Sequence, residues 1–561
     1  MKKNDKNNTP ELTPEEVDKA FEDALNLVKA KMDDDPEGFL DMMRSYMKRY
    51  VPRIPVSDWT ETHPGRMSCG SDRFYANLAS DLNAEFTILN QNGLMPDGTP
   101  YAAAMSLAAY LEDIVSGTGV WQAVRNIYKR TYGAQLPFYE VDPDDYFEDD
   151  INIQDVKLLI WQAISRCGEV KGSVYSPISQ AVDVMSEIAF DILVDRFDSA
   201  PLASRAFETI KKIFHKGDYF EVRSLGLWLS MYNPLTASPF GREDIKKEAA
   251  NLLDTLEEKF ININPDISDA IYFTEADDSW LDYVSFLGCS TATLLSELAT
   301  IHGFTTLSEK ILGIKKLPMM MYSIEEVSGK TVTIKDLLNR TRIVDKNSFG
   351  KGALWKKGNG IAAALVKFGD TYSINGLCTF LPVPPEKKGE IMLTEITEDQ
   401  IMAFKKLISK NRGRKLYYCK TLRDLSDILE TTGWPMKPDD LVKPDNHTNY
   451  LLAISETDGP TIFPGDCAIF NDKANPFFGS IPKESLGDDQ MSFVFNAVLP
   501  DDLIDYIVDH KLLSKACIFT SQGKRVGHRI VQDNLRFLFH FYRSAVYDIP
   551  EQFLSKENNE D

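Results

Sequence analysis

Apolar residues recur at helical spacing from about Leu12 to Leu317, and explicit start and stop residues divide the pattern. Helix starts are expected at Thr99-Pro100, Ser176-Pro177 and Ser199 with Pro201, and helix ends at Gly117 and Gly217. Proline in a first turn loses no hydrogen bond, and glycine suits the residue after a last turn. Residues 244–260 repeat the amphipathic pattern. Short links between such helices predict an α-helical bundle or array over residues 12–320, without a fixed repeat period.

The sequence pattern changes to short runs of β-branched residues with glycine over residues 321–385. Thr331–Ile334 is strand-like, and Ile361–Phe368 leads through Gly369-Asp370 into Thr371–Leu381. Because glycine accepts the positive φ of tight hairpin turns, the last two runs predict a hairpin. We therefore expect a small, barrel-like β domain here, followed by a proline-rich linker at 381–389.

Helical and strand patterns mix over residues 386–550, which predicts an α+β domain. Helices are expected from Thr397 to Gly413, over 422–429 and over 525–546, and strands over 415–419, 450–455 and 467–470. The polar segments 1–11 and 551–561 are expected to be disordered tails. The chain is thus predicted to be multidomain.

Composition narrows the class of protein. The 561 residues are 43% hydrophobic and 26% charged, as in globular proteins, and exceed the usual size of one core. The net charge of −22 opposes non-specific binding to nucleic acid or to anionic membranes. Seven scattered cysteines without a C-x-x-C pair suit a reducing compartment. With no signal peptide and no apolar stretch of about 18 residues, we expect a soluble, cytoplasmic protein without a membrane partner.

The familiar catalytic motifs are missing from the sequence. Gly329-Lys330-Thr331 and Gly358-Asn359-Gly360 resemble phosphate loops but precede strand-like runs, so we interpret them as turns. The seven histidines show no paired metal-ligand spacing, and we expect neither a metal nor a cofactor. Cys69 precedes a helix start and lies near His63 in sequence, but an inert cysteine is the favoured interpretation.

One predicted helix carries a ladder of acidic residues at a spacing of four: Asp183, Glu187, Asp191 and Asp195. Like charges at this spacing each cost about 0.2–0.5 kcal/mol. Water or basic residues from a neighbouring helix are the expected compensation, and a divalent ion is the alternative.

Two basic clusters stand out in this acidic chain. The first combines cations with Tyr417 and Tyr418, and the second follows one face of the last predicted helix. The candidate anion- or partner-binding residues are Lys405, Lys406, Lys410, Arg412, Arg414, Lys415, Arg525, Arg529, Arg536 and Arg543. They suit a phosphate backbone or an acidic protein, but pairing with the chain's own carboxylates is the favoured alternative.

Several segments resemble an uncharacterised bacterial family, a domain of unknown function associated with gut bacteria. The resemblance rests on residues 110–139, 151–161, 331–348 and 531–539. It implies coverage of most of the chain but no known activity, and it transfers no catalytic residue.

The sequence therefore leaves the function unknown. The favoured hypothesis is a non-enzymatic interaction or scaffold protein with a protein partner. A nucleic-acid- or polyanion-associated protein that uses the basic C-terminal surfaces is less favoured. An enzyme whose active site combines residues distant in sequence is the third alternative.

Overall fold

The computed structural model describes most of the chain between residues 36 and 543. The described residues are 36–167, 175–237, 281, 287–336, 339–346, 355–381, 398–434, 449–456, 458–483, 485–486, 489–490, 493, 499–514, 530 and 533–543. Outside them lie the predicted tails, the helix over 244–260, the linker after Leu381, and both Arg525 and Arg529.

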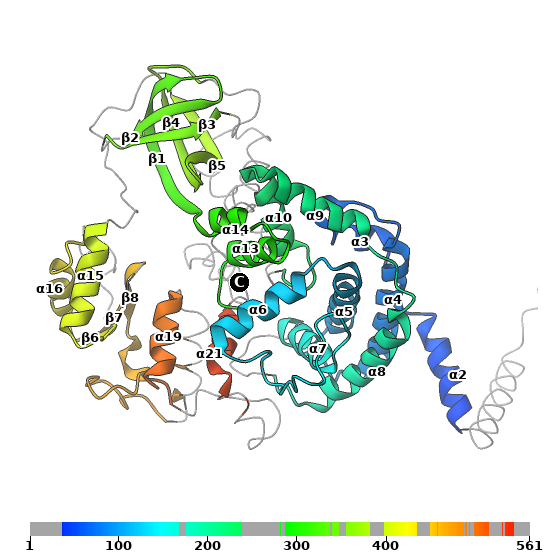
Figure 1. The fold of residues 1–561 in the computed structure, drawn as a ribbon. Helices are drawn as coiled ribbons and strands as arrows, with labels where there is room; N and C mark the ends of the chain where they lie inside the picture. Colours follow the sequence, from blue (N-terminus) through cyan, green and yellow to red (C-terminus); the bar gives the residue numbers. More distant parts are fainter. Residues whose placement is uncertain are drawn as a thin grey trace, which may run out of the picture.

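Helices dominate the N-terminal part, as predicted (Figure 1). In chain order they are α2 (Pro36–Lys48), α3 (Val56–Thr60), η1 (Pro64–Arg66), α4 (Asp72–Leu89), η2 (Asn90–Asn92), α5 (Thr99–Ser116), α6 (Val120–Tyr132), α7 (Ile153–Cys167), α8 (Gln180–Phe197), α9 (Ser204–Lys216), α10 (Tyr219–Met231), α13 (Thr291–Ile301) and α14 (Thr305–Leu312). Among the described residues, no helix has both the length and the apolar character needed to cross a bilayer.

The predicted helix ends are confirmed where glycine follows the last turn. Gly117 and Gly217 take φ values of 64° and 59° after α5 and α9. The start of α8 was placed too early. The Ser179 hydroxyl, rather than Ser176, accepts the hydrogen bond from the Val182 amide, so the helix begins at Gln180. Capping geometry, rather than proline alone, sets this boundary.

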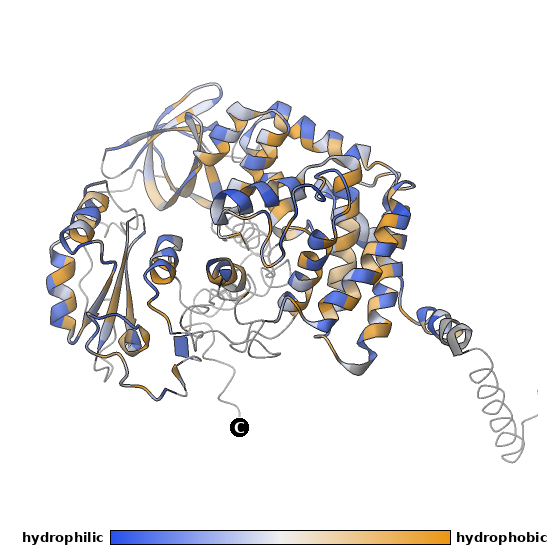
Figure 2. Ribbon diagram, turned by 60° about the horizontal axis from the view of Figure 1, so that its bottom comes forward, coloured by the Kyte–Doolittle hydropathy of each residue, from blue (hydrophilic) through white to orange (hydrophobic). Residues whose placement is uncertain are grey.

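Helix α5 forms the centre of the helical part. Leu107, Tyr110 and Leu111 are completely buried, and α4 and α7 pack against it. Most of the other helices carry both hydrophobic and hydrophilic positions (Figure 2). Buried apolar residues of α3 to α10, α13 and α14 join one large core, which supports the predicted burial of amphipathic stripes.

The next five strands form a closed sheet. They are β1 (Lys315–Val327), β2 (Thr331–Asp336), β3 (Thr341–Asp345), β4 (Gly360–Phe368) and β5 (Thr371–Leu381), in the order β1-β2-β3-β5-β4. Strand β4 also pairs with β1, so neither is left as an edge. Only the β3–β5 pair is parallel. The β4–β5 hairpin turns at Gly369, with a φ of 62°, as predicted.

Alternating burial explains this second core. Val332 and Ile334 point inward from β2 and meet Tyr322 and Ile324 of β1. Both phosphate-loop look-alikes are turns that precede strands, which confirms that interpretation. However, β1 begins at Lys315, within the region expected to be helical.

The C-terminal part contains a three-stranded antiparallel sheet with helices on both faces (Figure 1). Its elements are α15 (Glu398–Lys410), β6 (Leu416–Cys419), α16 (Leu422–Glu430), β7 (Tyr450–Ser455), β8 (Gly459–Pro464), η4 (Asp466–Ile469), α19 (Asp501–Asp509) and α21 (Leu535–Arg543). Every residue of the central strand β7 is buried. This explains why the sequence of β7 is a continuous apolar run and does not alternate between apolar and polar residues.

The predicted strand over 467–470 is wrong, because this segment forms the 3₁₀ helix η4. An apolar run of four residues does not distinguish a strand from a buried turn of helix.

Helix α21 packs against the N-terminal helical part of the chain. The Phe537 ring lies 5.4 Å from that of Tyr128, 5.6 Å from that of Phe138 and 6.1 Å from that of Trp161. Its buried residues therefore belong to the same core as the N-terminal helices. The sequence pattern assigned this helix to the C-terminal α+β domain, but residues of the N-terminal helical part cover its apolar face.

Candidate functional site

The predicted basic residues separate into two groups in the structure. Lys415 and Arg536 pair with carboxylates of the chain itself. The Lys415 ammonium lies 2.7 Å from an oxygen of Asp502, and the Arg536 guanidinium forms a two-point pair with Asp505. These two cations therefore stabilise contacts within the C-terminal part. Arg543 is the last residue of α21.

The other cations remain exposed around the end of α15. Lys405, Lys406 and Lys410 project from this helix, and Arg412 and Arg414 follow it. Arg412 has a φ of 59° and Gly413 a φ of 81°. These two left-handed residues end the helix and turn the chain back into β6.

A pocket of about 660 Å³ opens beside this turn. Four exposed cations line it: Lys410, Arg412, Arg414 and Lys420. None of the four forms an ion pair with another residue in the described part of the chain. A volume of this size falls in the range of ligand pockets, roughly 300–1,000 Å³.

Aromatic and apolar groups form the remaining walls of this pocket, which we call the basic pocket. Tyr417 and Tyr418 are half-buried, and Phe477 also lines the pocket. The Tyr417 hydroxyl donates to the Arg414 carbonyl at 3.1 Å, which holds the ring beside the cations. The only carboxylate lining the described pocket, Asp424, accepts hydrogen bonds from the Lys420 and Thr421 amides at the start of α16.

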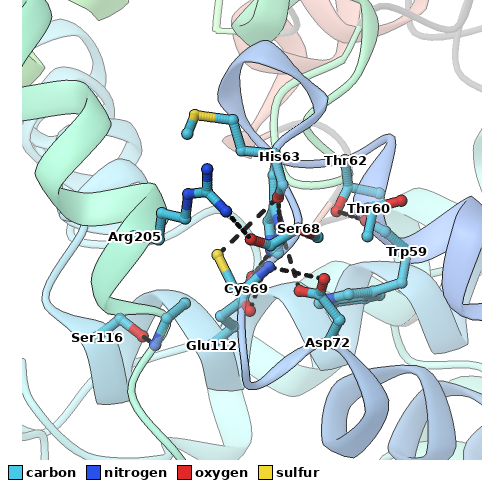
Figure 3. Close-up of polar contacts among 12 residues, drawn as sticks. Trp59, Thr60, Thr62, His63, Ser68, Cys69, Asp72, Glu112, Ser116 and Arg205 are labelled. Carbon is cyan, nitrogen blue, oxygen red and sulfur yellow. Dashed lines mark hydrogen bonds and ion pairs between the residues drawn. The ribbon is translucent and has the colours of Figure 1, made fainter.

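A second polar cluster lies near the start of the helical part (Figure 3). His63 precedes η1, Cys69 lies in the next loop, Asp72 begins α4 and Glu112 is in α5. His63 Nε2 is 2.9 Å from a Glu112 oxygen, and Nδ1 is 3.0 Å from the Met67 carbonyl oxygen. Donor atoms of His63, Cys69 and Asp72 lie within 4.8 Å of one another. The structure thus brings Cys69 and His63 together.

Burial controls the electrostatics of this cluster. Burial lowers the pKa of His63, but the hydrogen bond and charge of Glu112 outweigh this effect and leave that pKa raised. Burial also raises the pKa of the Cys69 thiol. Burial therefore opposes formation of the thiolate, so the place of Cys69 before α4 does not activate it as a nucleophile.

Sequence reasoning missed Glu112, which lies 49 residues from His63. An available signal was the acidic pair Glu112-Asp113 inside the otherwise apolar helix predicted from Thr99. The two neighbours have different partners. Asp113 accepts hydrogen bonds from the Val120 and Trp121 amides and so caps α6.

The acidic ladder lies on α8. Asp183 pairs with Lys157 of α7 at 2.8 Å, as expected for compensation by a neighbouring helix. Glu187, Asp191 and Asp195 are exposed to solvent.

Part of the helical region matches a known protein family. Residues 53–243 match DUF3843. This family is described as a protein of unknown function, which confirms the predicted resemblance to an uncharacterised domain. The DUF3843 match covers about a third of the chain and includes the segments 110–139 and 151–161, but not 331–348 or 531–539. The His63 cluster lies within it, and the basic pocket does not. Comparisons with curated proteins and with solved structures gave no match.

Proposed function

We propose that this protein is a cytoplasmic, non-enzymatic interaction protein that binds an acidic or phosphorylated segment of a protein partner in the basic pocket. The helical part (12–320), the barrel-like part (321–385) and the α+β part (386–550) are its proposed domains. The observation that carries the proposal is the group of four exposed cations around one pocket of about 660 Å³. Guanidinium groups recognise carboxylates and phosphates by paired hydrogen bonds.

The shape and charge of the molecule favour a peptide over a nucleic acid. The basic pocket is bounded by β6, α16 and the loop around Phe477, so it accommodates a short segment. The net charge of −22 repels a long polyanion outside the pocket, whereas screening by salt leaves short contacts inside it effective. The pocket cations therefore attract a short acidic segment, and the net negative charge of the chain repels it only weakly.

Removal of two pocket charges is expected to weaken binding of a fluorescein-labelled peptide of phosphoserine and glutamate. Replacing Arg412 and Arg414 with glutamine should raise its Kd by at least about tenfold. A hydrogen bond to a charged group contributes about 1.5–3 kcal/mol, and about 1.4 kcal/mol corresponds to tenfold. Fluorescence anisotropy of the full chain at low salt measures the change.

The matched control replaces Lys405 and Lys406 with glutamine. This variant removes the same charge from α15 but leaves the pocket lining intact, so its Kd should change by less than about twofold. Equal weakening by both variants would show general charge attraction and contradict a defined site. Tighter binding of a labelled oligothymidylate than of the peptide would contradict the proposed partner class.

A further inference from the structure

Three side chains of different chemistry converge in the His63 cluster. They offer one imidazole nitrogen, one thiol sulfur and one carboxylate oxygen, all within 4.8 Å of one another. His63 Nδ1 and Asp72 Oδ1 are 3.4 Å apart. Tetrahedral Zn²⁺ with bonds of about 2.0–2.3 Å holds its ligand atoms roughly 3.3–3.7 Å apart. The donor atoms are therefore at most about 1 Å farther apart than in such a site. Cys69 is only partly buried.

A buried carboxylate oxygen without a hydrogen bond favours a cation at this place. Asp72 is 3% exposed, and its Oδ2 accepts a hydrogen bond from the Cys69 amide at 2.8 Å. Its Oδ1 is buried and receives no hydrogen bond from the described residues. It faces His63 Nδ1 at 3.4 Å, which is longer than a normal hydrogen bond. A buried carboxylate oxygen without a hydrogen bond is costly, and a metal ion bound by both atoms would satisfy it.

Glu112 gives His63 the environment of a metal ligand. A ligating histidine commonly donates its second ring N–H to a carboxylate, which fixes the orientation of the ring. Here Nε2 faces Glu112 at 2.9 Å, and Nδ1 faces Asp72 and the Met67 carbonyl. The ring nitrogen that does not contact Glu112 is thus the one directed toward the other donors, and it donates to the Met67 carbonyl in this structure.

We propose that His63 Nδ1, Cys69 Sγ and Asp72 bind Zn²⁺, with Glu112 as the residue that positions the imidazole. A mixed nitrogen, sulfur and oxygen set suits this borderline-soft ion, whereas Mg²⁺ and Ca²⁺ prefer oxygen ligands alone. The Met67 carbonyl oxygen, 3.0 Å from Nδ1, or a water fills the fourth position. Binding releases the thiol proton and the Nδ1 proton, while Nε2 keeps its proton and donates it to the Glu112 carboxylate.

Cobalt substitution tests this site directly. The full chain, stripped of metal with a chelator, is titrated with Co²⁺ and followed by absorption spectroscopy. We expect tetrahedral d–d bands together with a thiolate-to-cobalt charge-transfer band, and Zn²⁺ should abolish both. Absence of these bands would overturn the proposal.

Variants assign the ligands. Cys69→Ser should lose the charge-transfer band, while the matched Cys378→Ser variant of strand β5 should keep it. Glu112→Gln should weaken Zn²⁺ binding by about 10–100-fold in competition with a chromogenic chelator, as for other residues that orient a ligand. Circular dichroism and thermal melting of each apo variant establish that it is folded. A spectrum unchanged in the folded Cys69→Ser variant would also overturn the proposal.

Discussion

Replacing Asp155 with alanine is expected to lower the free energy of unfolding by about 3–5 kcal/mol. Asp155 is 1% exposed and accepts hydrogen bonds from the hydroxyls of Tyr110, at 2.8 Å, and Tyr146, at 2.9 Å. The buried guanidinium of Arg125 lies 5.0 Å from the Tyr146 ring centre and supplies the positive charge of this network. The variant leaves that charge and two buried hydroxyls without their shared partner.

The loss comes from the groups that remain, rather than from a strong attraction that disappears. Burial raises the pKa of Asp155, and the charge of Arg125 only partly opposes that rise. The charge of Arg125 and the two tyrosine hydrogen bonds therefore offset only part of the cost of burying the carboxylate. Removing the carboxylate leaves the buried guanidinium with the exposed Glu148, 4.0 Å away, as its only ion-pair partner among the described residues, and leaves two buried hydroxyls without their carboxylate acceptor, which is the reason for the large expected effect.

Urea unfolding of the full chain, followed by tryptophan fluorescence, measures this change through the midpoint. Glu148→Ala is the control, because Glu148 is 64% exposed and lies 4.0 Å from Arg125. A surface pair of this kind contributes at most about 1 kcal/mol. If the two variants unfold at the same urea concentration, the Asp155 network does not hold the helical part together.

Replacing Phe537 with alanine is expected to destabilise the protein by about 3–5 kcal/mol, the usual cost of removing a buried phenylalanine ring. Phe537 is 1% exposed, and its ring contacts Tyr128, Phe138 and Trp161. The cavity would lie between α21 and the N-terminal helices. We therefore expect loss of α21 docking as well as a lower melting temperature.

Thermal melting and limited proteolysis together test this contact. Phe147→Ala is the matched control, because Phe147 is 56% exposed. It should change the stability by no more than about 0.5 kcal/mol. Similar melting temperatures for both variants, with equal rates of cleavage, would show that α21 contributes nothing to the common core.

Local signals in the sequence predicted many elements well. Gly117 and Gly217 ended their helices where expected, and Gly369 formed the turn of the β4–β5 hairpin. These features depend on left-handed backbone conformations that glycine adopts much more readily than other residues, so they can be predicted without knowledge of the fold. The prediction of a strand over 467–470 failed because an apolar run this short shows neither a helical nor a strand period.

Ion pairs between residues distant in sequence could not be predicted in the same way. The basic residues looked alike in sequence, yet Lys415 and Arg536 meet Asp502 and Asp505, while Arg412 and Arg414 stay exposed at a pocket. Charge attraction has no sequence period, so only the arrangement of β6, α19 and α21 decides which cations are neutralised.

The sequence by itself determined the order of a helical part, a run of short strands and a mixed C-terminal part, because hydrophobic periodicity and turn residues act locally. Only the tertiary structure decided that α21 completes the N-terminal core and that Glu112 meets His63 across 49 residues. Such contacts form when distant apolar faces are buried together, and this burial fixes which polar side chains lie side by side.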